Sequence, residues 1–181
     1  GYTFKGWSTS ANGTVEYNDL EEVENLTSLK NGVANLYAVW EANTYEVVYD
    51  KNTPTNTSNA VTGIMVNSTH TYDTYKNLSP NQHSLEGYTF KGWATSSNGL
   101  VVYNDETSVI NLRASGSITL YAVWEANKYT ITFNTTGGSY VNNIQVIFDE
   151  AFLKIVPPTR KGYNFEGYYT LPNGKGIKYY N

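Results

Sequence analysis

The octapeptide "LYAVWEAN" occurs twice without a change, at residues 36–43 and again at residues 120–127. In the first copy Leu36, Ala38 and Trp40 alternate with Tyr37 and Val39, which is the period of a β-strand. Both faces of that strand are apolar, as in a strand covered on both sides. The duplication predicts that each copy closes a small hydrophobic core of its own.

Other duplicated stretches surround the octapeptide and set the length of the repeat. "GYTFKGW" stands at residues 1–7 and 87–93, and a weaker copy, "GYNFEGY", at residues 162–168. The duplicated octapeptide gives a unit of about 84 residues, which is longer than the units of solenoids. We therefore predict tandem small domains: the second half of a repeat (1–43), a complete repeat (44–127) and the first part of a third repeat (128–181). Such an array reads as an excerpt of a longer one.

Each unit reads as strands plus one short helix. Residues 129–133 and 144–148 have strand patterns around a Gly-Gly turn. In "GYTFKGW", a β-bulge at Gly6 would bring Trp7 to the side of Phe4, and the same glycine recurs as Gly92 and Gly167. Residues 19–32 and 105–116 read as helices, the first with Asp19 as N-cap and Glu22 three positions on. The predicted fold class is α+β and β-rich, a mixed sheet with one short helix in each unit.

Large apolar residues in the strand patterns are the predicted core. Burying an aromatic ring stabilises a small domain by several kcal/mol, so core is the favoured interpretation of the four tryptophans. The alternative is that the Trp rings are exposed and stack on sugars, as in a carbohydrate-binding module. The predicted core comprises Tyr2, Phe4, Trp7, Leu36, Trp40, Phe90, Trp93, Leu120, Trp124, Ile131, Phe133 and Phe165. Weaker candidates for ligand contact are Tyr168, Tyr169, Tyr179 and Tyr180.

Composition excludes several classes of protein. The net charge is −4 and no cluster of Lys or Arg is present, so a nucleic-acid partner is not expected. The apolar runs are far shorter than the ~20 residues that span a bilayer, which predicts no membrane insertion in this segment. The chain has no cysteine, which excludes disulfides, thiolate metal sites and Cys nucleophiles. A surface rich in Thr, Asn, Ser and Tyr is typical of an exported bacterial protein.

No set of residues has the spacing of an active site or of a calcium loop, although Asp19 and Asp105 with Asn18 and Asn104 leave calcium as an alternative. The carboxylates Asp19, Glu21, Glu22 and Glu24 cluster at one predicted helix start, and most of them are lost in the other copy. The two histidines have no counterparts in the other copies and no partners for a triad or a metal. We therefore predict no enzyme, no catalytic residue, no metal and no cofactor.

Three blocks in order, "GYTFKGW", "LYAVW" and "KYTITFNTTGGSYVNN…PPTRKGYNFEGYYT", resemble the Listeria–Bacteroides repeat, which is the B-repeat of internalins. The resemblance implies a small β-grasp (ubiquitin-like) fold in extracellular, wall-attached proteins, where most members are spacers or adhesive modules. There are departures: Tyr168 stands where Trp7 and Trp93 stand, and "YDKNTPTNTSNAV" replaces the Gly-Gly turn in the complete copy.

The expected function is therefore a non-catalytic spacer or adhesion segment of a bacterial cell-surface protein. The expected partners are host-surface or glycan ligands. The short connector "EANT" (residues 41–44) leaves little room for swivel, which predicts a stiff array. The two incomplete units also lack strands that a complete unit has, so each would expose a sheet edge. Strand addition between neighbouring molecules at these edges predicts self-association.

Overall fold

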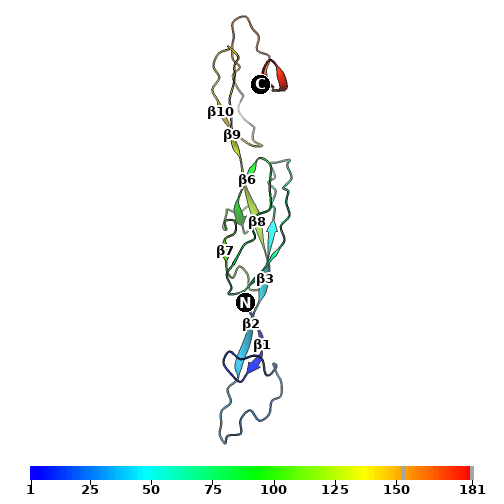
Figure 1. The fold of residues 1–181 in the computed structure, drawn as a ribbon, viewed down its shortest axis with the longest axis vertical. Helices are drawn as coiled ribbons and strands as arrows, with labels where there is room; N and C mark the ends of the chain where they lie inside the picture. The colour runs from blue at the N-terminus through cyan, green and yellow to red at the C-terminus, as the bar shows by residue number, and fades with distance from the viewer. Residues whose placement is uncertain (152–153, 180–181) are drawn as a thin grey trace.

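The computed structural model describes residues 1–151 and 154–179, and all the regular structure in this part of the chain is β-strand. Figure 1 shows the sheets following one another along the long axis, with β1–β2 at one end and β9–β10 toward the other. The strands are β1 (Tyr2–Ser8), β2 (Tyr37–Ala42), β3 (Thr44–Asp50), β4 (Ser68–Thr71), β5 (Lys76–Asn77), β6 (Tyr88–Ala94), β7 (Ser108–Val109), β8 (Gly116–Ala126), β9 (Lys128–Ile131), β10 (Ile144–Ile147), β11 (Tyr168–Leu171) and β12 (Lys175–Tyr179).

The middle unit contains a four-stranded sheet in the order β4-β3-β8-β6. Strands β3 and β8 run parallel, with Tyr45 opposite Gly116 and Asp50 opposite Tyr121, and both outer strands are antiparallel to their neighbours. The sheet is therefore mixed, as the sequence predicts. The parallel pair lies in the centre, which fits the apolar character of both faces of residues 120–124.

The two incomplete units form the parts of this sheet for which they carry strands. The β1–β2 pair sets Phe4 opposite Trp40, as β6–β8 sets Phe90 opposite Trp124. The β9–β10 pair repeats the β3–β4 pair in the same register. Local sequence and register therefore specify each pair even where the rest of the unit is not in the chain.

The predicted β-bulge is confirmed. The register shifts between Phe4 and Gly6 in the first unit and between the equivalent Phe90 and Gly92 in the middle unit. The bulge turns the Trp side chain back toward the preceding Phe, so the Phe90 and Trp93 rings meet edge to face at 5.0 Å. Gly92 has a φ of 137°, and a Cβ there would lie 2.6 Å from the Tyr103 carbonyl oxygen, which excludes a side chain.

The helix prediction is wrong, and with it the α+β class and the helix-bearing β-grasp expectation, because the described residues contain no helix. Near the predicted cap of Asp19 and Glu22 the chain forms only a single turn, one residue earlier, in which Glu21 Oε2 accepts from the Asn18 backbone N–H at 2.7 Å. Left-handed residues then break the segment at Leu20 and Asn25. In the middle unit Ser108 and Val109 pair with β5 instead. Tertiary pairing thus outweighs the weak helix preference of so short a segment.

The core lies in the middle unit and centres on Trp93, which has no exposed surface. Its ring packs 5.0 Å from that of Tyr49 on β3. The buried cluster joins strands β3, β6, β7 and β8 with one residue of the connecting loops. Its members are Tyr45, Val47, Tyr49, Leu78, Trp93, Val109, Leu120 and Ala122.

Burial of the predicted core residues depends on the unit in which they lie. Trp93 and Leu120 are buried, and Phe4, Trp7, Leu36, Phe90, Trp124, Ile131 and Phe133 are half-buried. Burial is wrongly predicted for Tyr2, Trp40 and Phe165, which are exposed. In the middle unit the indole Nε1 of Trp124 donates to the Lys51 carbonyl at 2.9 Å, in the loop after β3. Residues 1–43 contain no such loop, so Trp40 is 58% exposed.

Candidate functional site

A single asparagine joins each unit to the next. Asn43 separates β2 from β3, its backbone N–H donates to the Gly1 carbonyl at 2.8 Å, and its carbonyl accepts from Tyr72 N–H at 2.8 Å. Asn127 lies in the same way between β8 and β9, bonded to Gly87 and to Phe148 at 2.8 and 2.9 Å. One residue is thus hydrogen-bonded to the units on both sides. We call this arrangement the junction, formed by Gly1, Tyr2, Thr3, Asn43, Tyr72 and Asp73 and again by Gly87, Tyr88, Thr89, Asn127, Phe148 and Asp149.

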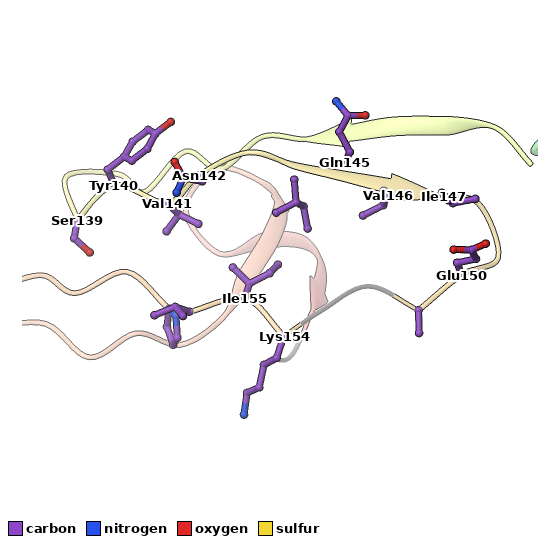
Figure 2. A pocket seen from close by; sticks show the side chains of 14 residues that line it. Ser139, Tyr140, Val141, Asn142, Gln145, Val146, Ile147, Glu150, Lys154 and Ile155 are labelled. Atoms are coloured by element: carbon purple, nitrogen blue, oxygen red, sulfur yellow. The ribbon is translucent and has the colours of Figure 1, made fainter.

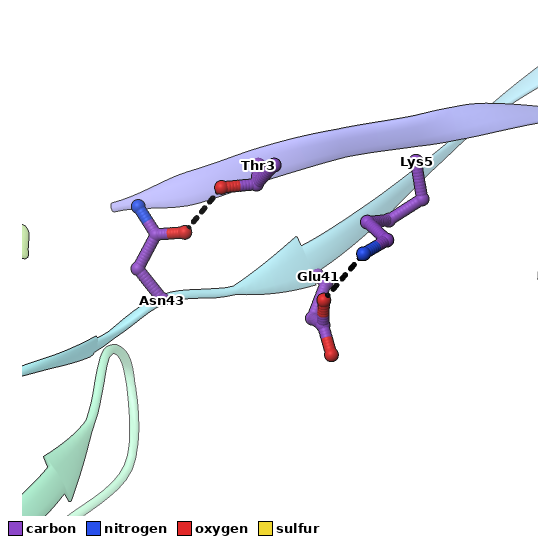
Figure 3. Close-up of polar contacts among 4 residues, drawn as sticks. All are labelled: Thr3, Lys5, Glu41 and Asn43. Atoms are coloured by element: carbon purple, nitrogen blue, oxygen red, sulfur yellow. Dashed lines mark hydrogen bonds and ion pairs between the residues drawn. The ribbon is translucent and has the colours of Figure 1, made fainter.

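Side chains reinforce the strand pair that leads into each junction (Figure 3). The Thr3 hydroxyl donates to Asn43 Oδ1 at 2.5 Å, and the Thr89 hydroxyl donates to Asn127 Oδ1 at 2.6 Å. Lys5 pairs with Glu41 at 3.0 Å. This ion pair recurs between the equivalent Lys and Glu of the middle unit, also at 3.0 Å. Ion pairs exposed to water stabilise little, and the asparagine side chain is held by the threonine hydroxyl.

An aromatic pair and a tyrosine–aspartate bond cross each junction. The rings of Tyr2 and Tyr72 meet edge to face at 5.7 Å, and the Tyr2 hydroxyl donates to Asp73 Oδ2 at 2.7 Å. At the next junction the same two contacts recur. The rings of Tyr88 and Phe148 meet at 5.9 Å, and the Tyr88 hydroxyl donates to Asp149 Oδ2 at 3.2 Å.

Hydrogen bonding fixes the charge states at the junction. Asn111, whose Nδ2 donates to Asp73 at 2.6 Å, and Tyr2 hold the pKa of the Asp73 carboxyl below its ordinary value. The bond to that carboxylate raises the pKa of Tyr2. Burial raises the pKa of Tyr88, and the nearby Asp149 carboxylate raises it further. At neutral pH the first junction therefore pairs a neutral Tyr2 phenol with an ionised Asp73 carboxylate.

A glycine lets the aromatic ring of the next unit approach the backbone. Gly87 has a φ of +80°, and a Cβ there would collide with the Phe148 ring. A Cβ at Gly1 would collide with Tyr72 in the same way. The third copy, Gly162, has a φ of +82°, but a Cβ there would meet nothing within 4 Å, and the adjacent Tyr163 is 65% exposed. The glycine at this position thus serves both backbone conformation and close packing across the junction.

The tyrosines predicted as ligand contacts do not gather around a cavity. Tyr168 is half-buried, with its ring 5.1 Å from that of Phe133. Tyr169 is half-buried under the Lys178 ammonium, which lies 5.7 Å from its ring centre. Tyr179 is exposed and pairs with Tyr168 across β11 and β12, and Tyr180 lies outside the described residues.

An open pocket of about 710 Å³ lies in the third unit, along β10 and the segment that follows it (Figure 2). Its apolar lining includes Val141, Ile144, Ile147 and Ile155. Glu150 lies near Ile147 at one end of it, and Lys154 lies beside Ile155. Within the described ranges, no three His, Asp or Glu residues come close enough together to hold a metal ion. The pocket therefore offers a largely apolar surface.

Sequence reasoning missed the junction, although a signal for it was present. "TYD" at residues 71–73 and "IFD" at residues 147–149 place an aromatic residue and an aspartate directly after the returning strand of two units. Neither pair fits a strand, a cap or a turn pattern. The recurring aromatic–Asp pair becomes informative only in the structure, where it lies beside the Gly-Tyr pair of the preceding unit.

The three parts of the chain match the sequence model of the Listeria-Bacteroides repeat domain, over residues 1–39, 45–123 and 129–181. The chain belongs to the Listeria–Bacteroides repeat family. The resemblance inferred from the sequence is thus confirmed. The residues between the matched stretches, 40–44 and 124–128, contain the two junction asparagines.

Two relatives come from Evansella cellulosilytica. One, named as a Gly-rich membrane protein, is 31% identical over 169 residues, which is 93% of this chain and 18% of the relative. The other, named as a membrane protein, is 30% identical over 169 residues, which is 93% of this chain and 23% of the relative. Internalin H of Listeria monocytogenes is 33% identical over 95 residues, 52% of this chain and 16% of that protein.

This repeat-family chain thus spans less than a quarter of the length of each of these relatives. No solved structure matches it. In the described part of the chain, no helix is long and apolar enough to cross a bilayer.

Proposed function

We propose that this segment is a non-catalytic spacer of a bacterial cell-surface protein, and that its junctions hold successive repeats in line. One observation carries the proposal: the backbone bridge, the Thr–Asn bond, the aromatic pair and the Tyr–Asp bond recur at both junctions. Contacts that served only the folding of one unit would have no need to repeat between units.

The physical basis of the spacer is the brevity of the connection. A flexible linker lets its two domains reorient, whereas a single residue bonded on both sides leaves few backbone torsions free. At Asn127, both the N–H and the C=O are hydrogen-bonded, one to each unit. The array then extends by one unit length with each repeat, and a domain attached to its end is held at a defined distance.

A place at the cell surface is supported by the names of the relatives, which are membrane proteins and an internalin. The polar surface, with many Thr, Asn and Ser and few charges, suits an exported protein. We therefore propose that the chain is part of an extracellular stalk attached to the cell wall or the cell surface.

Insertion at the junction tests the spacer directly. Small-angle scattering of the chain should give one elongated particle. Insertion of Gly-Ser-Gly-Ser after Asn127 should broaden the distribution of interatomic distances, because the third unit then swings. The same insertion after Asn98, in the exposed turn that follows β6, is the matched control and should leave the scattering unchanged. Superimposable curves for all three proteins would reject the stiff junction.

An adhesive role with a host-surface or glycan ligand stays a prediction, for which a glycan array is the test. The structure weakens its carbohydrate-binding form. Trp93 has no exposed surface, and the Trp124 indole is bonded to the Lys51 carbonyl. The Trp93 ring therefore cannot stack on a sugar, and the Trp124 ring is half-buried.

A further inference from the structure

The first and last strands of the complete unit lie side by side in the centre of its sheet. Strand β3 begins at Thr44, directly after the junction residue Asn43, and β8 ends at Ala126, directly before Asn127. The two strands run parallel and are hydrogen-bonded neighbours. The chain on either side of the complete unit is therefore connected to it through two adjacent strands.

The parallel direction decides how these two strands respond to tension. Their register runs from Tyr45 opposite Gly116 to Asp50 opposite Tyr121, so the start of β3 and the end of β8 lie at opposite ends of the pair (Figure 1). A pull along the array draws β3 back toward the first junction and β8 forward toward the second. The strands can then separate only by sliding past each other. All six paired positions share the load at once, which is loading in shear.

Two side-chain bonds continue this contact beyond the last strand pair. The indole Nε1 of Trp124 on β8 donates to the Lys51 carbonyl at 2.9 Å. Asn52 Nδ2 donates to the Ala122 carbonyl on β8 at 2.8 Å and to the Ser97 carbonyl at 2.9 Å. Both bonds to β8 tie it to the residues that directly follow β3. We call the β3–β8 pairing and these side-chain bonds the shear joint.

The shear joint lies against the core of the unit. Tyr45, Val47 and Tyr49 of β3 are buried, as are Leu120 and Ala122 of β8. A hydrogen bond in such surroundings is strengthened by the low local dielectric, and water is not at hand to replace it. Sliding of the strands would also draw these side chains out of their packed positions, so the hydrogen bonds and the packing resist the same motion.

We propose that the complete unit carries tension along the array, and that the shear joint sets the force it withstands. Resistance to a pull is governed by the rate at which the loaded structure unfolds, and not by its equilibrium stability alone. A pair of strands loaded in shear opens only when several bonds break together, which makes that rate low. The inference does not rest on the spacer proposal, because a junction that swings would still pass tension into β3 and β8.

The direction of pulling tests the proposal. The chain has no cysteine, so two introduced cysteines give unique attachment points for single-molecule force spectroscopy. Thr44→Cys with Lys128→Cys loads the joint in shear. Thr44→Cys with Ser117→Cys peels the two strands apart from one end, because Ser117 lies opposite Glu46. The three attachment positions are exposed, so the core stays intact. The shear direction should need a severalfold higher unfolding force than the peeling direction.

Asn52→Gly tests the side-chain part of the joint. Asn52 has a φ of 42°, which glycine adopts readily, so the substitution removes both Nδ2 bonds without adding backbone strain. It should lower the unfolding force in the shear direction. It should leave the peeling force unchanged, because peeling begins at the Thr44 end, and Asn52 lies beyond the other end of the strand pair.

Asn59→Gly is the matched control. Asn59 is also half-buried in a loop, and its Nδ2 donates to the Glu86 carbonyl at 3.4 Å, away from the joint. Both unfolding forces should stay as in the parent protein. Equal forces in the two directions would overturn the proposal. An equal loss in both directions for Asn52→Gly, or a loss in shear no larger than that of Asn59→Gly, would overturn it as well.

Discussion

Tyr2 and Asp73 lie 71 positions apart in the chain, yet the Tyr2 hydroxyl donates to the Asp73 carboxylate at 2.7 Å across the boundary between two repeats. Tyr88 and Asp149 repeat the relationship at the next boundary. A tyrosine of one unit is thus hydrogen-bonded to a carboxylate of the next.

Gly87→Ala should loosen the second junction, and Gly162→Ala is its matched control. Both glycines have φ near +80°, so both substitutions carry the same backbone strain, about 1–3 kcal/mol. Only at Gly87 does the added Cβ meet the Phe148 ring. The distance distribution between spin labels in the middle and third units should broaden in G87A alone. Equal broadening in both variants would assign the effect to strain.

Removing the partners of Asp73 should raise the pKa of its carboxyl in a definite order. Asn111 contributes most to the lowered pKa and Tyr2 contributes next, so Asn111→Ala should raise it more than Tyr2→Phe. Carboxyl chemical shifts followed during an acid titration measure both. The reverse order, or no change in either variant, would show that the two bonds do not hold the charge.

Trp93→Ala should destabilise the middle unit by about 3–5 kcal/mol, because it empties a fully buried site. Trp40→Ala is the comparison, since Trp40 is mostly exposed and its ring lies 5.4 Å from that of Phe4. Its loss should cost about 1 kcal/mol. Chemical denaturation followed by circular dichroism checks both. Similar losses for the two tryptophans would contradict the difference in burial.

The middle unit should lose stability as the pH falls below the ordinary histidine value. Burial lowers the pKa of His70, with Lys76 adding a smaller effect, so the folded state disfavours the imidazolium. Below 6.5, the ordinary value, the unfolded chain binds a proton that the folded chain refuses. The melting temperature should therefore fall with pH until the lowered pKa is passed. Above 6.5 this contribution is constant.

His70→Val is the matched variant for that titration. The third unit has Val146 at the same register position, opposite Tyr129 as His70 is opposite Tyr45. H70V should retain the sheet and lose the decline in melting temperature between neutral pH and the lowered pKa. An unchanged decline would place the responsible group elsewhere.

Much of the fold could be predicted from local sequence. The repeat spacing and the alternation in "LYAVW" identify the strands, and Gly6 with Trp7 identifies the bulge, because both depend on neighbours along the chain. The helix prediction is wrong for a physical reason. Asn111, placed at φ 53°, bonds Asp73 in the junction, and no helical pattern can reveal that tertiary contact.

Trp40 and Trp124 show the other limit of the sequence. They lie in the same octapeptide, yet one is exposed and the other is half-buried and bonded to Lys51. Identical local sequence predicts identical strands but not identical surroundings, because burial depends on segments far away in the chain. The junction was missed for the same reason, since its two halves come from different repeats.

Each boundary is built from short blocks that recur in successive copies: a Gly-Tyr pair before the bulge, an asparagine connector, and an aromatic–Asp pair after the returning strand. Recombination that adds or deletes one whole period therefore regenerates a complete boundary at the point of exchange. A lineage can lengthen or shorten such a repeat array in fixed steps without evolving a new interface.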